Sequence, residues 1–170
     1  MASLLVSDTS VLIDLHRGGL LEALFTLPFE IGVPDLLFER ELRHWGGPAL
    51  EPLGLKVLSL DADGVALAQS YRGREPRLSV ADAFALALAK AGGHILLAGD
   101  RSLRDLANAE QVACHGVLWV LDGLESGALL QPQALLAALE AIASHPRCRL
   151  PASEVHRRIE RYRRAASRHR

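Results

Sequence analysis

The feature that most constrains the fold is an alternation of short apolar runs with helical patterns. Strand-like apolar runs occupy residues 4–8, 29–33, 55–60, 94–98 and 111–115, and most of the segments between them have helical spacing. Strands that alternate with helices favour a mostly parallel sheet covered by helices. From Pro132 onward the pattern is helical only. We therefore predict an α/β fold with a helical C-terminal extension, and the length of 170 residues favours a single domain.

Composition and cysteine usage favour an ordinary soluble protein of the cytoplasm. The chain is 49% hydrophobic with a formal charge of −1, and no apolar stretch approaches the roughly 18 residues that would indicate a membrane span. Cys114 and Cys148 have no CxxC partner, so we expect reduced thiols. The seven histidines form no HExxH pattern, and neither a GxxxxGK[ST] loop nor a GxSxG elbow is present. These absences disfavour a zinc site, a nucleoside triphosphatase and an α/β-hydrolase.

Four carboxylates stand where such a fold places functional groups. Asp8 ends the run 4–8, and Asp100 ends a second apolar run just before a helical pattern. Asp82 lies in the first turn of a long alanine-rich helix, and Glu41 lies on the helix expected over 35–45. Strand ends and helix starts gather on the ligand-binding side of a parallel sheet. Clustered like charges need a cation, and oxygen-only ligands favour Mg²⁺ or Mn²⁺.

Each acid also has a plain structural interpretation. Ser79 and Asp82 form an S-x-x-D capping box, and Asp100 can act as the N-cap of the helix that follows it. Glu41 alone would most often lie on a solvated helix face. Asp8 is harder to dismiss, because an acid that closes an apolar strand is costly to bury unless it is paired or bound to metal. Capping and function can coexist at one residue, so both interpretations stay open.

Three segments together resemble a PIN domain over about residues 4–127. They are VSDTSVLIDL at 6–15, the glutamate-bearing FERELRHW at 38–45, and LSVADAFALALAKAGGHILLAGDRSLRDLA at 78–107. The resemblance implies a three-layer α/β/α fold whose acids and divalent metal hydrolyse RNA, leaving a 5′-phosphate and a 3′-hydroxyl. Many members of this family are toxins held inactive by a small antitoxin protein.

The resemblance assigns the site residue by residue. Asp8, Asp82 and Asp100 match the first, third and fourth acids of the family. Ser10 matches a small polar residue that supports the site. For the second acid the family has a glutamate that is often followed by an apolar residue, and Glu41 with Leu42 fits this pattern and is favoured. Glu39, two residues earlier on nearly the opposite helix face, is the alternate. All four acids are expected to be both metal ligands and catalytic residues.

The resulting expectation is a metal-dependent endoribonuclease, the toxin of a toxin–antitoxin pair. Its expected partners are RNA, an antitoxin and a second copy of the chain in a homodimer. Residues 1–130 would form the nuclease domain and 131–170 a helical extension that compact toxins often lack. A catalytically weak module that binds RNA or protein is the main alternative, and a phosphatase or nucleotide-handling enzyme is a third.

The C-terminal segment is strongly basic. Seven of the 19 basic residues and one of the 20 acidic residues lie in 157–170. The rest of the chain therefore has 12 basic and 19 acidic residues and a formal charge of −7. These arginines either contact RNA phosphates or belong to a helix that docks on the body through Val155, Ile159 and Tyr162, which recur at helical spacing.

Overall fold

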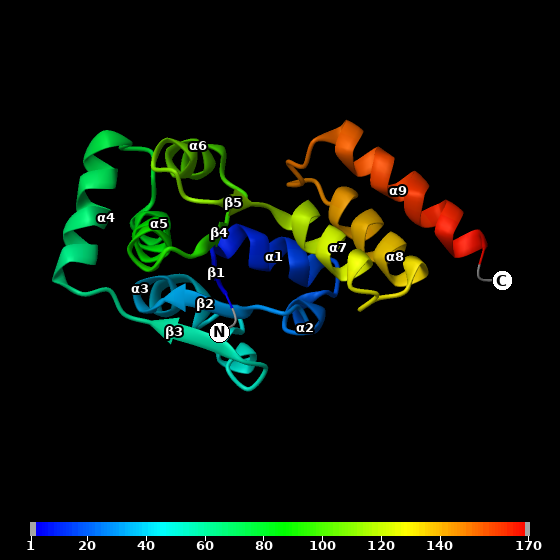
Figure 1. Cartoon of the computed structure of the whole chain (residues 1–170), viewed down its shortest axis with the longest axis horizontal. Coiled ribbons are helices and arrows are strands. Elements are labelled where there is room, and N and C mark those ends of the chain that lie inside the picture. Colours follow the sequence, from blue (N-terminus) through cyan, green and yellow to red (C-terminus); the bar gives the residue numbers. More distant parts are fainter. Residues whose placement is uncertain (1–2, 169–170) are drawn as a thin grey trace. The chain divides into compact units, whose positions relative to one another are not determined.

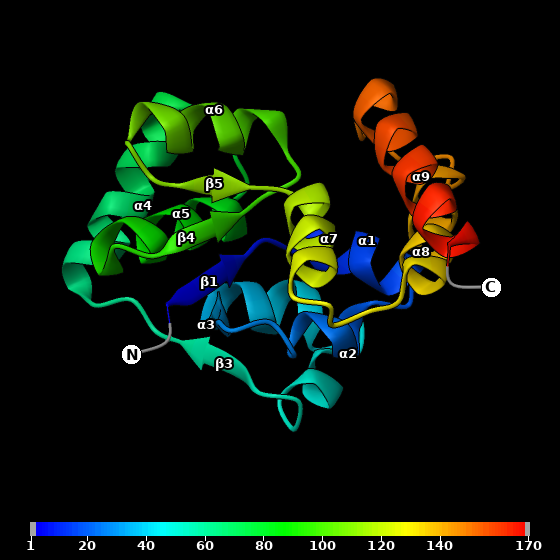
Figure 2. The same ribbon diagram turned by 45° about the vertical axis from the view of Figure 1, so that its right-hand side comes forward.

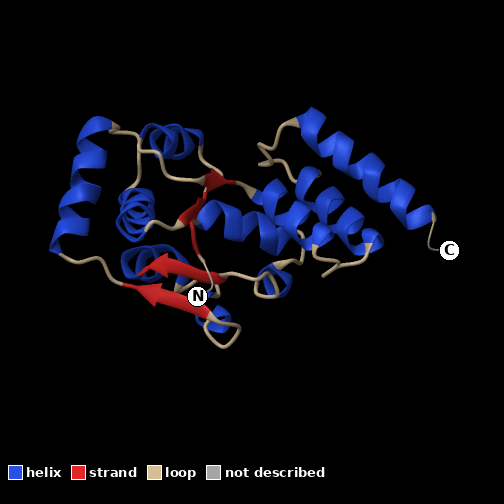
Figure 3. Ribbon diagram, viewed as in Figure 1, coloured by secondary structure: helices blue, strands red, loops and turns tan. Residues whose placement is uncertain are grey.

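Five parallel strands form a single sheet in the computed structural model, which describes residues 3–168 (Figure 3). Their order across the sheet is β3-β2-β1-β4-β5, and every pairing among them is parallel. The strands are β1 (Leu4–Ser7), β2 (Glu30–Pro34), β3 (Leu55–Leu58), β4 (Ile95–Leu97) and β5 (Cys114–His115). The chain moves outward from β1 in one direction and then returns to add β4 on its other side. The point between β1 and β4 is therefore the topological switch point, where open α/β sheets bind ligands.

Helices account for most of the remaining chain (Figure 1). The α-helices are α1 (Thr9–Arg17), α2 (Leu21–Leu24), α3 (Asp35–Leu37), α4 (Ala62–Arg74), α5 (Val80–Gly92), α6 (Arg101–Ala109), α7 (Val117–Ser126), α8 (Pro132–Ala143) and α9 (Ala152–Ser167). A π-helical turn, η1 (Phe38–Leu42), continues α3, and a 3₁₀ turn, η2 (Gly47–Leu50), follows it. The predicted α/β architecture is confirmed. In residues 3–168 no helix has the length and apolar character that crossing a membrane requires.

Helix α5 is the central packing element of the sheet. It contacts β1, β2 and β4, and its alanines and leucines from Ala81 to Ala89 are buried. The Ser79 hydroxyl accepts a hydrogen bond from the amide of Asp82 at its start, and Gly93 ends it in the left-handed conformation. These two signals fix the length of the helix and place its first turn at the carboxyl ends of the strands.

One predicted helix departs from regular geometry. The segment 35–45 begins as α3 and widens into η1, where the amide of Arg43 donates to the Phe38 carbonyl at 2.8 Å across five residues. A π turn changes the directions in which the following side chains point, and such turns are frequent at functional sites.

The chain forms two compact units. The first contains the sheet and is built from the chain up to Leu12 together with Pro28–Gly116, and the second is built from Ile13–Leu27 and the chain from Val117 onward. In the second unit α8 packs along α9, and α7 contacts α2 and α8 (Figure 2). The predicted division near residue 130 stays a prediction.

Candidate functional site

Asp8 is held rigidly where β1 ends. Its amide donates to the Leu97 carbonyl at 2.8 Å, which ties it to β4. Its carboxylate accepts three hydrogen bonds: from the amide of Val11 on Oδ1 at 2.8 Å, and from the Ser10 hydroxyl and the Gly99 amide on Oδ2 at 2.8 and 2.9 Å. The residue is only 1% exposed. Asp8 thus joins the two strands at the switch point of the sheet.

The bonding of Asp8 leaves it partly unsatisfied. A carboxylate has about four acceptor positions, and the three bonds leave one position, on Oδ1. Burial raises the pKa of Asp8, the amides of Val11 and Gly99 and the Ser10 hydroxyl oppose the rise, and the negative charge of Asp100 adds to it. A buried carboxylate of this kind gains stability from a cation.

Asp82 lies in the first turn of α5 and is half-buried. Burial is the largest cause that raises the pKa of Asp82 to about 7, and the negative charge of Asp8 is the next. The charges of Glu41 and Asp100 raise it further, while a hydrogen bond with Ser79 lowers it. Because the amide of Asp82 also donates to the Ser79 hydroxyl at 3.0 Å, the residue both starts the helix and belongs to a cluster of carboxylates.

The two glutamates of η1 have different surroundings. Glu41 accepts a hydrogen bond from the Thr9 hydroxyl at the start of α1, and its charge acts on Asp82. Glu39 is exposed and pairs with Arg43, whose Nε donates to Oε2 at 2.6 Å and lowers the pKa of the glutamate. The structure therefore brings Glu41 toward the other acids and leaves Glu39 in a surface ion pair. The functional role of Glu41 stays a prediction, and this arrangement favours Glu41 over Glu39.

Asp100 is the N-cap of α6 and is exposed. Its Oδ2 accepts a hydrogen bond from the amide of Leu103 at 3.0 Å. Its charge nevertheless raises the pKa of both Asp8 and Asp82. Asp100, like Asp82, therefore caps a helix as the sequence predicted and also belongs to the acidic cluster.

The four acids have no cationic partner in the described chain. Within residues 3–168, none of Asp8, Glu41, Asp82 and Asp100 forms an ion pair with lysine, arginine or histidine. Over the same residues, no three aspartate, glutamate, histidine or cysteine side chains are close enough to hold a metal ion. The donors are oxygen atoms only and their charges are uncompensated, which fits a hard divalent cation, although their side chains would have to move closer together to bind one.

Two residues support the site in addition to those assigned from the sequence. The amide of Gly99 donates to Asp8, and a Cβ at this position would lie 2.5 Å from the Ser10 Oγ, so only glycine fits without displacing that hydroxyl. Thr9 orients Glu41. A glycine directly before the strand-end acid Asp100 was the available signal for the first, whereas nothing local to Thr9 indicates a partner 32 residues away.

Comparison with known families agrees with this architecture. An all-parallel sheet with uncompensated acids at its switch point has a candidate ligand site there. A family model described as a PIN domain matches residues 4–164. The chain therefore belongs to the PIN-domain family, a nuclease-type fold, and the match extends into α9. No curated protein matched the sequence.

Proposed function

We propose that the protein is a divalent-metal-dependent endoribonuclease that hydrolyses RNA phosphodiester bonds. The observation that carries the proposal is the gathering of four carboxylates, without ion-pair partners in residues 3–168, where β1 and β4 end. Membership of a nuclease-type family supports it. A cluster of acids that raise one another's pKa costs stability, and binding of a cation is the function that would justify this cost.

In this proposal Asp8, Glu41, Asp82 and Asp100 hold Mg²⁺ or Mn²⁺ and are the catalytic residues. Bound there, such ions would supply an activated water and charge balance for the attacking and leaving oxygens of a phosphodiester. Asp8 would be the central ligand, since one acceptor position is left on its Oδ1. Ser10 and Gly99 fix the orientation of its carboxylate, and they take no part in the attack.

The remaining residues control position and protonation. Thr9 holds the carboxylate of Glu41 by its hydrogen bond. Because its pKa is raised to about 7, Asp82 is partly protonated at neutral pH, and it must release that proton to act as an anionic ligand. The expected result is a metal affinity that falls as the pH drops below 7. Water adds to phosphorus and the bond to the 3′-oxygen breaks, which leaves a 5′-phosphate and a 3′-hydroxyl.

We extend the proposal to the biological setting. The protein would be the toxin of a toxin–antitoxin pair, a homodimer in the cytoplasm that is held inactive by a small antitoxin. A short reading frame beside the gene whose product binds this chain and blocks RNA cleavage would support the toxin role. A neighbourhood without one would remove that role and leave the nuclease activity untouched.

The nuclease proposal is tested by incubating an end-labelled single-stranded RNA with the protein in millimolar Mn²⁺ or in EDTA. Cleavage is expected with Mn²⁺ only, and it should be abolished in Asp8→Asn. The matched control is Asp105→Asn on α6, whose carboxylate is exposed and only loosely paired with Arg101 at 3.8 Å. Cleavage that persists in EDTA or in Asp8→Asn would refute the proposal.

A catalytically weak module that binds RNA or protein is the second candidate. The observation in its favour is that no three potential ligands among residues 3–168 lie close enough together for metal binding. Such a module would bind RNA with equal affinity in Mn²⁺ and in EDTA and would release no product. Turnover of RNA in Mn²⁺ excludes it.

A further inference from the structure

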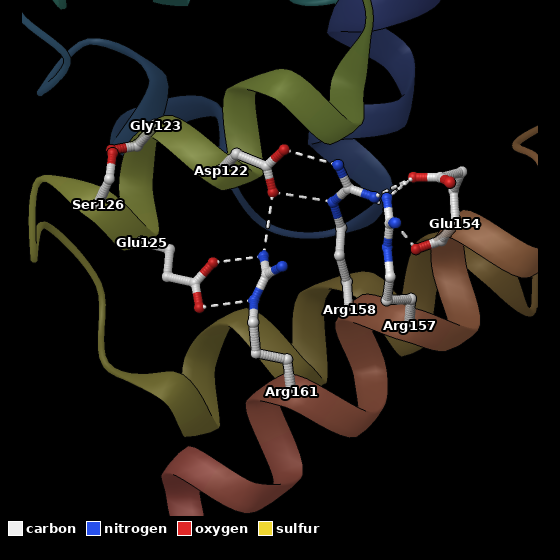
Figure 4. Close-up of polar contacts among 8 residues, drawn as sticks. All are labelled: Asp122, Gly123, Glu125, Ser126, Glu154, Arg157, Arg158 and Arg161. Atoms are coloured by element: carbon white, nitrogen blue, oxygen red, sulfur yellow. Dashed lines mark hydrogen bonds and ion pairs between the residues drawn. The ribbon is translucent and has the colours of Figure 1, made fainter.

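The arginines of α9 divide into an inward group and an outward group. Arg158 points inward: its Nε and Nη2 donate to the two carboxylate oxygens of Asp122 on α7 at 2.8 and 2.6 Å, and its side chain is 11% exposed (Figure 4). Val155 and Tyr162 are buried on the same side of the helix. Together these contacts dock α9 in the second unit, so Arg158 serves the fold and is not accessible to a ligand.

Two further arginines contribute to docking from the edges of the helix. Arg161 donates to Glu125 with Nε at 3.0 Å and to Asp122 with Nη2 at 3.1 Å. On the other side, Arg163 pairs with Glu140 of α8 at 2.8 Å. The acids of α7 and α8 therefore neutralise some of the arginines of α9, and the remaining arginines face solvent.

The outward group is a regular row. Arg157, Arg161, Arg164 and Arg168 follow one another at intervals of four, three and four residues, which places them on one face of the helix. The row extends from Arg157 to Arg168, 11 steps along the helix, or about 16 Å of helix axis. These arginines, with Glu160 and Ala165, line a depression of about 440 Å³. Arg170 lies outside the described residues.

The ion pairs of Arg157 and Arg164 in this row are weak and exchangeable, whereas Arg161 is also held by Glu125 and Asp122 of α7. The side chains of Arg157 and Arg164 are 66% and 76% exposed, and their partners Glu154 and Glu160 belong to the same helix. Exposed pairs of this kind contribute about 0–1 kcal/mol. In residues 3–168 Arg168 forms no ion pair within 4 Å. A phosphate could therefore replace these carboxylates at little cost.

We propose that this outer arginine row binds the phosphate backbone of single-stranded RNA. Guanidinium groups match phosphate oxygens bidentately, and without residues 157–170 the chain has a formal charge of −7, which repels a polyanion. Large apolar side chains are exposed at Leu53, Val57 and Leu129 and at none of the described positions of α9. Protein interfaces usually depend on apolar anchors, so a row of charge alone favours nucleic acid. The choice of RNA rests on the proposed function.

The test uses the full chain in EDTA, where no metal-dependent cleavage occurs, and a fluorescein-labelled uridine 20-mer titrated from 50 to 300 mM KCl. The variant Arg157→Gln/Arg164→Gln/Arg168→Gln should weaken binding at least tenfold at 100 mM KCl. Each phosphate contact in single strands contributes about 0.7 to the slope of log K against log salt, so the slope should fall by about 2. Arg161 is left unchanged because it also holds Glu125.

A charge-matched control distinguishes the row from net charge. Arg77→Gln/Arg147→Gln/Arg149→Gln removes the same charge from exposed positions elsewhere in the chain and should leave the slope unchanged. Equal losses in both triple variants would overturn the proposal, and so would an unchanged affinity in the row variant. Glu160→Gln, which removes the acid in the row, should tighten binding; weaker binding would also count against the row.

The binding assay is independent of the nuclease proposal. RNA that binds through the row but is not cleaved in Mn²⁺ would support the row and refute the nuclease. RNA cleaved with no change of affinity in the row variant would refute the row and support the nuclease. If the row variant lost binding to an acidic protein while its RNA affinity stayed unchanged, the row would be a protein-binding surface. That result would overturn the proposal.

Discussion

Replacement of Asp82 by asparagine should stabilise the metal-free protein. Burial and the charges of Asp8, Glu41 and Asp100 raise the pKa of Asp82 from 3.8 to about 7. Between these values the unfolded chain is ionised while the folded protein keeps the proton, so the stability of the wild type falls as the pH rises. The fall begins near pH 4 and is complete above pH 7.

The size of the effect follows from the shift. A change of about three pKa units at 1.36 kcal/mol per unit gives about 4 kcal/mol as an upper limit. The amide of an asparagine still costs free energy to bury, so the expected net gain is about 2 kcal/mol. For a chain of this size that is an increase of about 4–8 °C in Tm.

The assay is a set of thermal melts of wild type and Asp82→Asn in EDTA from pH 5 to pH 8, with Asp105→Asn as the surface control. The advantage of Asp82→Asn should grow with pH and level off above pH 7, and the control should stay within about 0.5 kcal/mol of wild type. Millimolar Mn²⁺ should raise the Tm of the wild type more than that of the variant. A variant that is less stable than wild type at pH 8, or a difference independent of pH, would refute the reasoning.

Three further predictions concern neighbouring residues. Glu41→Gln should abolish RNA cleavage in Mn²⁺ and Glu39→Gln should retain it; the opposite result would reassign the second acid. Gly99→Ala should lower the cleavage rate at least tenfold, because its Cβ would lie 2.5 Å from the Ser10 Oγ, and a rate equal to wild type would show that this hydroxyl is not needed. Arg158→Gln should lower the free energy of unfolding by about 2 kcal/mol in urea titrations, since it removes the charged hydrogen bonds to the partly exposed carboxylates of Asp122 and Glu154; a loss under 1 kcal/mol would contradict its docking role.

Much of the first unit could be predicted from the sequence because its signals are local. Ser79 and Gly93 mark the ends of α5, and Asp61 and Asp100 cap their helices through backbone amides. The alternation of strands and helices indicated a parallel sheet, and the position of Asp8 after an apolar run placed it at the edge where β1 ends. The gathering of the acids at that edge followed from topology alone.

The features that the sequence did not predict depend on contacts distant along the chain. The π turn of η1 orients Glu41 toward Thr9, 32 residues away. The pairing of Arg158 with Asp122 spans 36 residues, so the sequence could not decide between an RNA-binding and a docked tail. The structure assigns docking to one face of α9 and leaves the other face for solvent. Helical periodicity alone could not have predicted which acids form ion pairs with each arginine.

The central claim, that the four acids form a divalent metal site, is tested most directly by isothermal titration of Mn²⁺ into the metal-free protein at pH 7.5. Wild type should bind one or two ions and release protons, because Asp82 must ionise. Proton release is measured by repeating the titration in buffers of different ionisation enthalpy. Asp8→Asn should lose the binding while keeping the circular dichroism of the wild type. Wild type that binds no Mn²⁺ at millimolar concentration, or Asp8→Asn that binds it with unchanged affinity, would contradict the account.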